Sequence, residues 1–137
     1  MKEFRLVADW ISENYSSADK IIEVGVGKTT EALEELRKQL PQCALIATDV
    51  RKVPVPEGVK FIRDDVTNPD SSKYREADLI FSLRAPPELY SSLKQIAGEV
   101  DADLLVKPVS SEESPSWGKL VNYSGISFYF VKTGEEL

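Results

Sequence analysis

Hydrophobic residues follow two patterns that alternate along the chain. Short apolar runs predict strands at residues 20–24, 44–48, 59–63, 77–82 and 103–107, of which the first two are expected to be buried. Before the first run and between later ones, apolar residues recur at helical spacing. This spacing predicts helices over residues 2–15, 32–40 and 86–100. Two last runs, 119–123 and 126–132, flank Ser124-Gly125, a two-residue hairpin signal. The pattern therefore predicts strands that alternate with helices, followed by a hairpin.

This alternation predicts an α/β fold, a Rossmann-like three-layer sandwich. We expect a mostly parallel sheet with helices on both faces and a C-terminal antiparallel hairpin at one edge. One connection is too short for a helix, because only nine residues, Val50 to Gly58, separate the second and third strands. Since parallel connections normally contain about a dozen residues or more, we expect an irregular crossover there.

Composition narrows the function more than the fold. The chain has 137 residues, enough for a single domain spanning 1–137. It contains no histidine, which excludes Ser-His-Asp and Cys-His catalysis and imidazole metal sites, and we predict no metal. The net charge of −6 gives no direct nucleic-acid signal. The single cysteine, Cys43, excludes an intramolecular disulfide and is expected to be a buried small hydrophobe.

The chain also carries no sign of a membrane partner. No apolar run approaches the length of about 18 residues that a spanning helix needs. The first residues, Met1 to Arg5, lack a signal-peptide core. We therefore expect a cytoplasmic protein.

The most informative segment is a glycine turn, Glu23-Val24-Gly25-Val26-Gly27-Lys28-Thr29, between a predicted strand and a predicted helix. Gly25 allows a tight turn, and Gly27 allows the backbone to approach a ligand closely. A phosphate-binding P-loop would need a glycine where Ile22 stands, inside the strand. A dinucleotide site of the G-x-G-x-x-G type would need a glycine where Thr30 stands.

A third interpretation is an S-adenosylmethionine site, whose usual pattern places an acidic residue two positions before the first glycine. Glu23 occupies that position. A carboxylate there attracts the ammonium of the methionine moiety, directly or through water, whereas it would repel a pyrophosphate. The sign of the charge favours S-adenosylmethionine over a nicotinamide dinucleotide such as NAD. A strand-to-helix turn that binds nothing stays open as an alternative.

Two acidic positions follow the next two strands. Asp49 closes the second strand about 20 residues after the glycine turn, where an acidic side chain holds ribose hydroxyls. Asp64-Asp65-Val66 follows the third strand, and with Thr67-Asn68-Pro69 it equally predicts a polar turn. Because the carboxyl ends of parallel strands share one edge of the sheet, we expect Glu23, Asp49 and Asp65 to lie together there.

The chain resembles a reduced class I methyltransferase-type Rossmann domain and, more closely, the short archaeal proteins of uncharacterised protein family 0146. The likeness covers nearly the whole chain. It rests on Ile22-Glu23-Val24-Gly25-Val26-Gly27, Asp64-Asp65-Val66-Thr67, Ser82-Leu83-Arg84-Ala85-Pro86-Pro87-Glu88-Leu89 and Lys119-Leu120-Val121-Asn122-Tyr123. The methyltransferase resemblance implies that Asp65 accepts a hydrogen bond from the adenine amine and that Val66 contacts the ring.

The edge after the fourth strand carries candidate substrate residues. In amino-group methyltransferases an Asn or Asp precedes two prolines and an aromatic residue, whereas here Ser82 ends the predicted strand and Arg84 precedes the prolines. This departure puts amine methylation in doubt. Arg84 suits an anionic group instead, or is a surface arginine beside a helix start. Lys107 closes the fifth strand on the same edge and is a second candidate cation.

Three hypotheses follow for function. The first is an S-adenosylmethionine-binding domain of methyltransferase type, with its catalytic residues unassigned. The second is a non-catalytic Rossmann module that binds a nucleotide or a protein partner, and the third is a small NAD-binding domain. Because the strands, their connections and the hairpin use up nearly all 137 residues, we expect any substrate to be small or to be presented by a partner.

Overall fold

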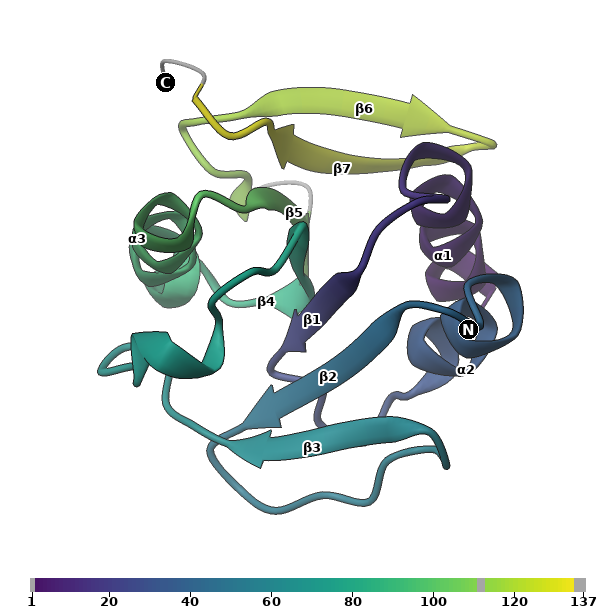
Figure 1. The fold of residues 1–137 in the computed structure, drawn as a ribbon. Coiled ribbons are helices and arrows are strands. Elements are labelled where there is room, and N and C mark those ends of the chain that lie inside the picture. The colour runs from purple at the N-terminus through teal and green to yellow at the C-terminus, as the bar shows by residue number, and fades with distance from the viewer. Residues whose placement is uncertain (1, 111–112, 135–137) are drawn as a thin grey trace.

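The computed structural model describes residues 2–110 and 113–134. Its regular structure consists of three α-helices, two short 3₁₀ helices (Ser71–Lys73 and Pro87–Leu89) and seven strands (Figure 1). The α-helices are α1 (Lys2–Asn14), α2 (Glu31–Gln39) and α3 (Tyr90–Val100). The strands are β1 (Lys20–Val24), β2 (Ala44–Asp49), β3 (Val59–Arg63), β4 (Leu79–Ala85), β5 (Asp103–Pro108), β6 (Lys119–Tyr123) and β7 (Ile126–Val131).

All seven strands belong to one sheet with the order β3-β2-β1-β4-β5-β7-β6. Strands β1 to β5 pair in parallel, while β7 is antiparallel to both β5 and β6. It follows that β6 runs in the same direction as the first five strands. The predicted mostly parallel sheet with a C-terminal antiparallel hairpin is confirmed. The order reverses between β1 and β4, and such a switch point is where open α/β sheets bind ligands.

Helices cover both faces of the sheet, as predicted. Since strand side chains alternate between the two faces, an apolar strand presents apolar side chains to the helices on each face. Ile21 of β1 packs in a hydrophobic cluster with α1 and α2, whereas the next residue, Ile22, packs in a second cluster with α3. Both side chains are fully buried. This two-sided burial explains why the parallel strands are continuous apolar runs in the sequence.

The short connection between β2 and β3 is irregular, as its length predicted. No regular element interrupts residues 50–58. Val53 and Val55 of this segment are partly buried against the α1–α2 cluster. Two side chains of an extended segment thus cover the part of the sheet that a crossover helix would otherwise cover.

The predicted bounds of the fourth strand, 77–82, are wrong. Strand β4 begins at Leu79 and continues to Ala85, so Ser82 lies within the strand and does not end it. The pairing register between β4 and β5 shifts between Leu83 and Ala85. Arg84 lies at this bulge in a left-handed conformation, with φ of 56°. Because of the bulge, β4 continues through Arg84 to Ala85, although the charged Arg84 suggests in the sequence that the strand has ended.

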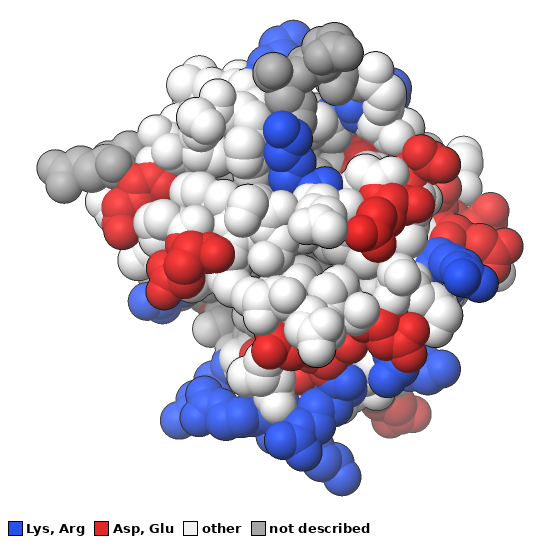
Figure 2. All heavy atoms as spheres, turned by 90° about the vertical axis from the view of Figure 1, so that its left-hand side faces the viewer, with Lys and Arg blue, Asp and Glu red and all other residues white. Residues whose placement is uncertain are grey.

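Strand β3 forms one edge of the sheet and carries positive charge. Figure 2 shows Lys and Arg side chains gathered at the lower end of one face, the end at which β3 lies in Figure 1. The exposed basic residues of β3 and of the segment before it are Arg51, Lys52, Lys60 and Arg63. Charged side chains on an exposed edge strand oppose pairing with another sheet. Among the described helices, none has the length and apolar character needed to cross a membrane.

Candidate ligand-binding site

Gly25 and Gly27 follow β1, Asp49 is the last residue of β2, and Asp65 follows β3. These three strands are neighbours in the sheet. The strand ends are level, because Val24 pairs with Thr48 and Asp49 pairs with Arg63. The first two predicted positions, Glu23 and Asp49, therefore lie at one edge of the sheet, beside the switch point between β1 and β4. The sequence order of these residues reflects their spatial order.

Both glycines of the turn adopt positive φ, 71° at Gly25 and 56° at Gly27. A side chain at Gly27 would meet no atom within 4 Å, so the backbone conformation alone favours glycine there. The turn is fixed to the end of β2, because the N–H groups of Gly25 and Val26 both donate to the Thr48 carbonyl, at 2.9 and 3.1 Å. The loop is thus held in shape by the neighbouring strand before any ligand arrives.

Glu23 is the least expected feature of this edge. Its side chain is only 1% exposed, and its ladder neighbours are Ala47 on β2 and Phe81 on β4. Among the buried side-chain polar atoms of the described residues, its Oε1 alone has no hydrogen-bond partner. Burial raises the pKa of the Glu23 carboxyl well above its usual value. The site therefore holds an acid whose charged form lacks a compensating cation among residues 2–110 and 113–134.

Asp49 connects the glycine turn to β2 in a way the sequence did not predict. Its Oδ2 accepts a hydrogen bond from the Gly27 N–H at 2.9 Å, and its Oδ1 accepts one from the Arg51 N–H at 3.1 Å. The two oxygens of a carboxylate have about four acceptor positions, so this anchoring leaves capacity for further donors. The assignment of Asp49 to ribose hydroxyls stays a prediction.

The segment after β3 forms the polar turn that was one of its two interpretations. The exposed Asp65 accepts at Oδ1 from the N–H and the hydroxyl of Thr67, at 2.9 and 2.7 Å, and these bonds lower its pKa. Its neighbour Asp64 accepts from the Tyr74 hydroxyl at 2.7 Å. Val66 is buried in the α3 cluster. The adenine roles of Asp65 and Val66 stay predictions, and within the described residues the Oδ2 atom of Asp65 has no hydrogen-bond partner.

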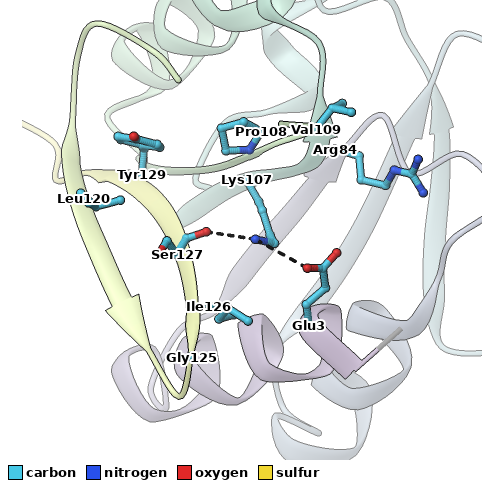
Figure 3. A pocket seen from close by; sticks show the side chains of 10 residues that line it. All are labelled: Glu3, Arg84, Lys107, Pro108, Val109, Leu120, Gly125, Ile126, Ser127 and Tyr129. Carbon is cyan, nitrogen blue, oxygen red and sulfur yellow. Dashed lines mark hydrogen bonds and ion pairs between the residues drawn. The ribbon is translucent and has the colours of Figure 1, made fainter. Parts of the chain in front are cut away.

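Ser82 and Arg84, the candidates near the end of β4, point to different surroundings. Ser82 is buried, and its hydroxyl donates to the Val24 carbonyl at 2.9 Å, which ties β4 to the end of β1. Arg84, two residues on, is exposed and lines a pocket of about 540 Å³. Lys107 lines the same pocket from β5. The structure thus places Arg84 and Lys107 in the lining of one pocket, although the Arg84 guanidinium extends away from Lys107 in Figure 3. Ser82 is directed toward the end of β1 instead.

This pocket lies on the β4–β5 side of the switch point, between the hairpin and the start of α1 (Figure 3). Its other lining residues include Glu3 of α1 and Ile126 and Tyr129 of β7, none of which the sequence analysis singled out. Trp10 fixes α1 over the hairpin, with edge-on ring contacts to aromatic side chains of β7 at centroid distances of 5.0 and 5.2 Å. No local sequence signal reveals a pocket built from the two ends of the chain.

Comparisons with known proteins agree with this architecture. The model of the family described as "Uncharacterised protein family (UPF0146)" matches residues 4–133 of this chain. A UPF0146 protein of Archaeoglobus fulgidus is 40% identical over 126 residues, which cover 92% of each chain. Among solved structures, the N-terminal domain of EvdMO1 with SAH bound is similar with a TM-score of 0.59 and 18% identity, over 73% of this chain and 47% of that one.

A second solved structure extends the likeness along the whole fold. The MycE methyltransferase of the mycinamycin biosynthetic pathway, in complex with Mg, SAH and mycinamycin VI, is similar with a TM-score of 0.61 and 12% identity. The likeness covers 98% of this chain and 49% of that one. The chain thus spans about half the length of either solved protein, and at these identities the likeness establishes a methyltransferase-like fold. Because the family model matches nearly the whole chain and the Archaeoglobus fulgidus relative is 40% identical to it, the chain belongs to the uncharacterised protein family UPF0146.

Proposed function

We propose that this protein binds S-adenosylmethionine at the carboxyl edge of β1, β2 and β3. The observation that carries the proposal is Glu23, a buried carboxyl at the end of β1 whose Oε1 has no partner within the described residues. A buried charge without a counter-ion is costly. A ligand that brings a cation to this edge would remove that cost, and the ammonium of S-adenosylmethionine is such a cation.

The other acidic residues support the same ligand. Asp49 retains acceptor positions beyond its bonds to Gly27 and Arg51, which suits ribose hydroxyls. Asp65 retains its Oδ2, which suits the exocyclic amine of adenine. The three carboxyls therefore offer acceptors to three donor groups of one molecule. A dinucleotide would instead place its pyrophosphate near Glu23, where both groups are negative.

When bound, S-adenosylmethionine supplies an electrophilic methyl group. The contribution of this chain is to bind and to orient, since methyl transfer depends chiefly on alignment of the reacting groups. The tied glycine turn fixes one end of the ligand site before binding. The pocket beside β4 and β5 lies across the switch point from it, where a second molecule has room. The solved neighbours bind SAH, the product left after methyl transfer, and this supports the proposed ligand.

Isothermal titration calorimetry with S-adenosylmethionine and SAH tests the proposal. We expect both to bind, and we expect Glu23→Gln to weaken binding by about tenfold, the value of one charge-assisted hydrogen bond. Glu57→Gln is the matched control, because Glu57 is exposed in the β2–β3 connection. If neither S-adenosylmethionine nor SAH produces heat of binding, while circular dichroism shows that the chain is folded, the proposal is overturned.

One observation favours binding without catalysis as a second candidate. The chain spans about half the length of the solved methyltransferase-like neighbours. The matched residues therefore have no counterpart to the other half of those proteins, where further substrate-holding elements could lie. This candidate, a nucleotide- or partner-binding module, predicts ligand binding that Glu23→Gln leaves unchanged. NAD in the same titrations tests the third hypothesis, which predicts that NAD binds more tightly than SAH.

A further inference from the structure

The pocket beside β4 and β5 combines positive charge with an apolar wall. Arg84 and Lys107 contribute the charge, whereas Leu120, Ile126 and Tyr129 of the hairpin form the wall. Its volume of about 540 Å³ lies within the range of small-molecule sites. Amphipathic lining of this kind selects a ligand with one charged end and an apolar body.

Arg84 is held at the rim of this pocket in an unusual way. It is the bulged residue between β4 and β5, and its φ of 56° is a conformation that costs a non-glycine residue about 1 kcal/mol or more. Its guanidinium has neither a hydrogen bond nor an ion pair within residues 2–110 and 113–134. Arg84 therefore occupies a strained backbone position that no hydrogen bond or ion pair of its side chain within the described residues explains.

Lys107 is the inner cation of the pocket. Its side chain is only 13% exposed, and its ammonium donates to the Ser127 carbonyl of β7 at 3.0 Å. The same ammonium lies 3.9 Å from the Glu3 carboxylate, as the dashed lines in Figure 3 show. Because Glu3 offsets one of the two cations, the lining carries one net positive charge. That balance fits a single negative group.

We propose that this pocket binds a small organic acid. Its carboxylate or phosphate oxygens contact Lys107 and an Arg84 side chain that turns inward from the rim, and its apolar body lies against the hairpin. Arginine is suited to this task because its planar donors match two oxygens of one oxyanion. Binding of the acid stands on the pocket alone. Its role as the substrate that accompanies S-adenosylmethionine rests on the proposed function.

Nuclear magnetic resonance titration tests the pocket with three probes of one shape. These probes are 2-naphthoate, 2-naphthyl phosphate and the neutral 2-naphthamide, followed in ¹H–¹⁵N spectra that include the Arg84 Nε–H. We expect at least one of the two anions to bind more tightly than the amide and to shift the Arg84 resonance. The affinities of naphthoate and naphthyl phosphate, compared with each other, identify whether the pocket prefers a carboxylate or a phosphate.

Two substitutions should change anion affinity in opposite directions. Arg84→Gln should weaken it about tenfold through the loss of a charge-assisted contact. Glu3→Gln should tighten it about threefold, because a partly exposed repulsive charge is removed and Lys107 is released. Arg75→Gln is the control, since Arg75 is exposed, precedes β4 and lies outside the pocket lining.

The two proposals fail separately. Equal affinity for naphthoate, naphthyl phosphate and naphthamide, or an Arg84→Gln variant with unchanged anion affinity, would overturn the anion pocket whether or not SAH binds. Anion binding with the expected response to both substitutions, in a protein that gives no heat with SAH, would support the pocket and reject the proposed function. Denaturation midpoints of all variants, measured in urea, establish that each remains folded.

Discussion

Replacement of Glu23 by Gln should change how stability depends on pH. Burial raises the pKa of this carboxyl above the value of 4.5 that it has when exposed. Between those two pKa values the folded protein binds a proton that the unfolded chain does not. The free energy of unfolding of the wild type must then fall as pH rises through this window. Gln, which does not titrate, removes that decline.

The structure fixes the form of the effect. Glu23 is 1% exposed, its Oε1 has no hydrogen-bond partner within the part of the chain that the structure describes, and burial is the cause of its raised pKa. One proton contributes at most about 1.4 kcal/mol per pH unit to the difference between the two proteins. The difference should be constant below the unfolded-state pKa, should grow in favour of Gln above it, and should level off once pH exceeds the folded-state pKa.

Urea denaturation from about pH 4 to about pH 9 measures this difference. The offset at the acidic end chiefly reports how well the Gln amide fits, because the wild-type carboxyl is then protonated in the folded state and mostly protonated in the unfolded state. Glu57→Gln, at an exposed position, should track the wild type throughout. A Glu23→Gln difference that stays flat across the range would refute the reasoning, because it would mean that the carboxylate ionises in the folded protein without cost.

Three further substitutions or reagents test other parts of the account. Gly27→Ala should destabilise the protein by about 1 kcal/mol in urea, because the new side chain has space but the positive φ strains it; a neutral effect would show that the turn relaxes. Arg84→Gly should stabilise by about 1 kcal/mol through relief of its own positive φ, while it loses anion binding; a loss of stability would show that the side chain supports the bulge. The pKa of the Cys43 thiol is raised to about 11, chiefly by its partial burial. A disulfide reagent at about pH 8 should therefore react with Cys43 far more slowly than with glutathione; equal rates would contradict this.

The fold was largely predictable because its central strands are buried on both faces. A continuous apolar run gave β1 its observed bounds, 20–24, and the apolar residues of the edge strand β3 gave it the bounds 59–63. The end of β4 was not predictable in this way. A bulge that places Arg84 in a left-handed conformation depends on pairing with β5, which no local pattern encodes. The sequence also could not show that β7, the second strand of the hairpin, lies between β5 and β6.

The candidate site divides in the same way. The placement of Glu23 and Asp49 at one edge of the sheet was predictable, because parallel strands carry their carboxyl ends to the same edge. Their roles toward a ligand stay predictions. The bond from the Gly27 N–H to Asp49 was not, because it depends on the turn geometry. The anion pocket joins Glu3 near one end of the chain to Tyr129 near the other. Such a site follows only from the three-dimensional arrangement.

The most direct test of the central claim is a crystal structure of the protein with SAH. We predict electron density for the ligand across the carboxyl ends of β1, β2 and β3. Its amino group should lie beside Glu23, directly or through one water, and its ribose should lie beside Asp49. Ligand density confined to the Arg84 pocket, with the Glu23 carboxyl still without a partner, would contradict the account.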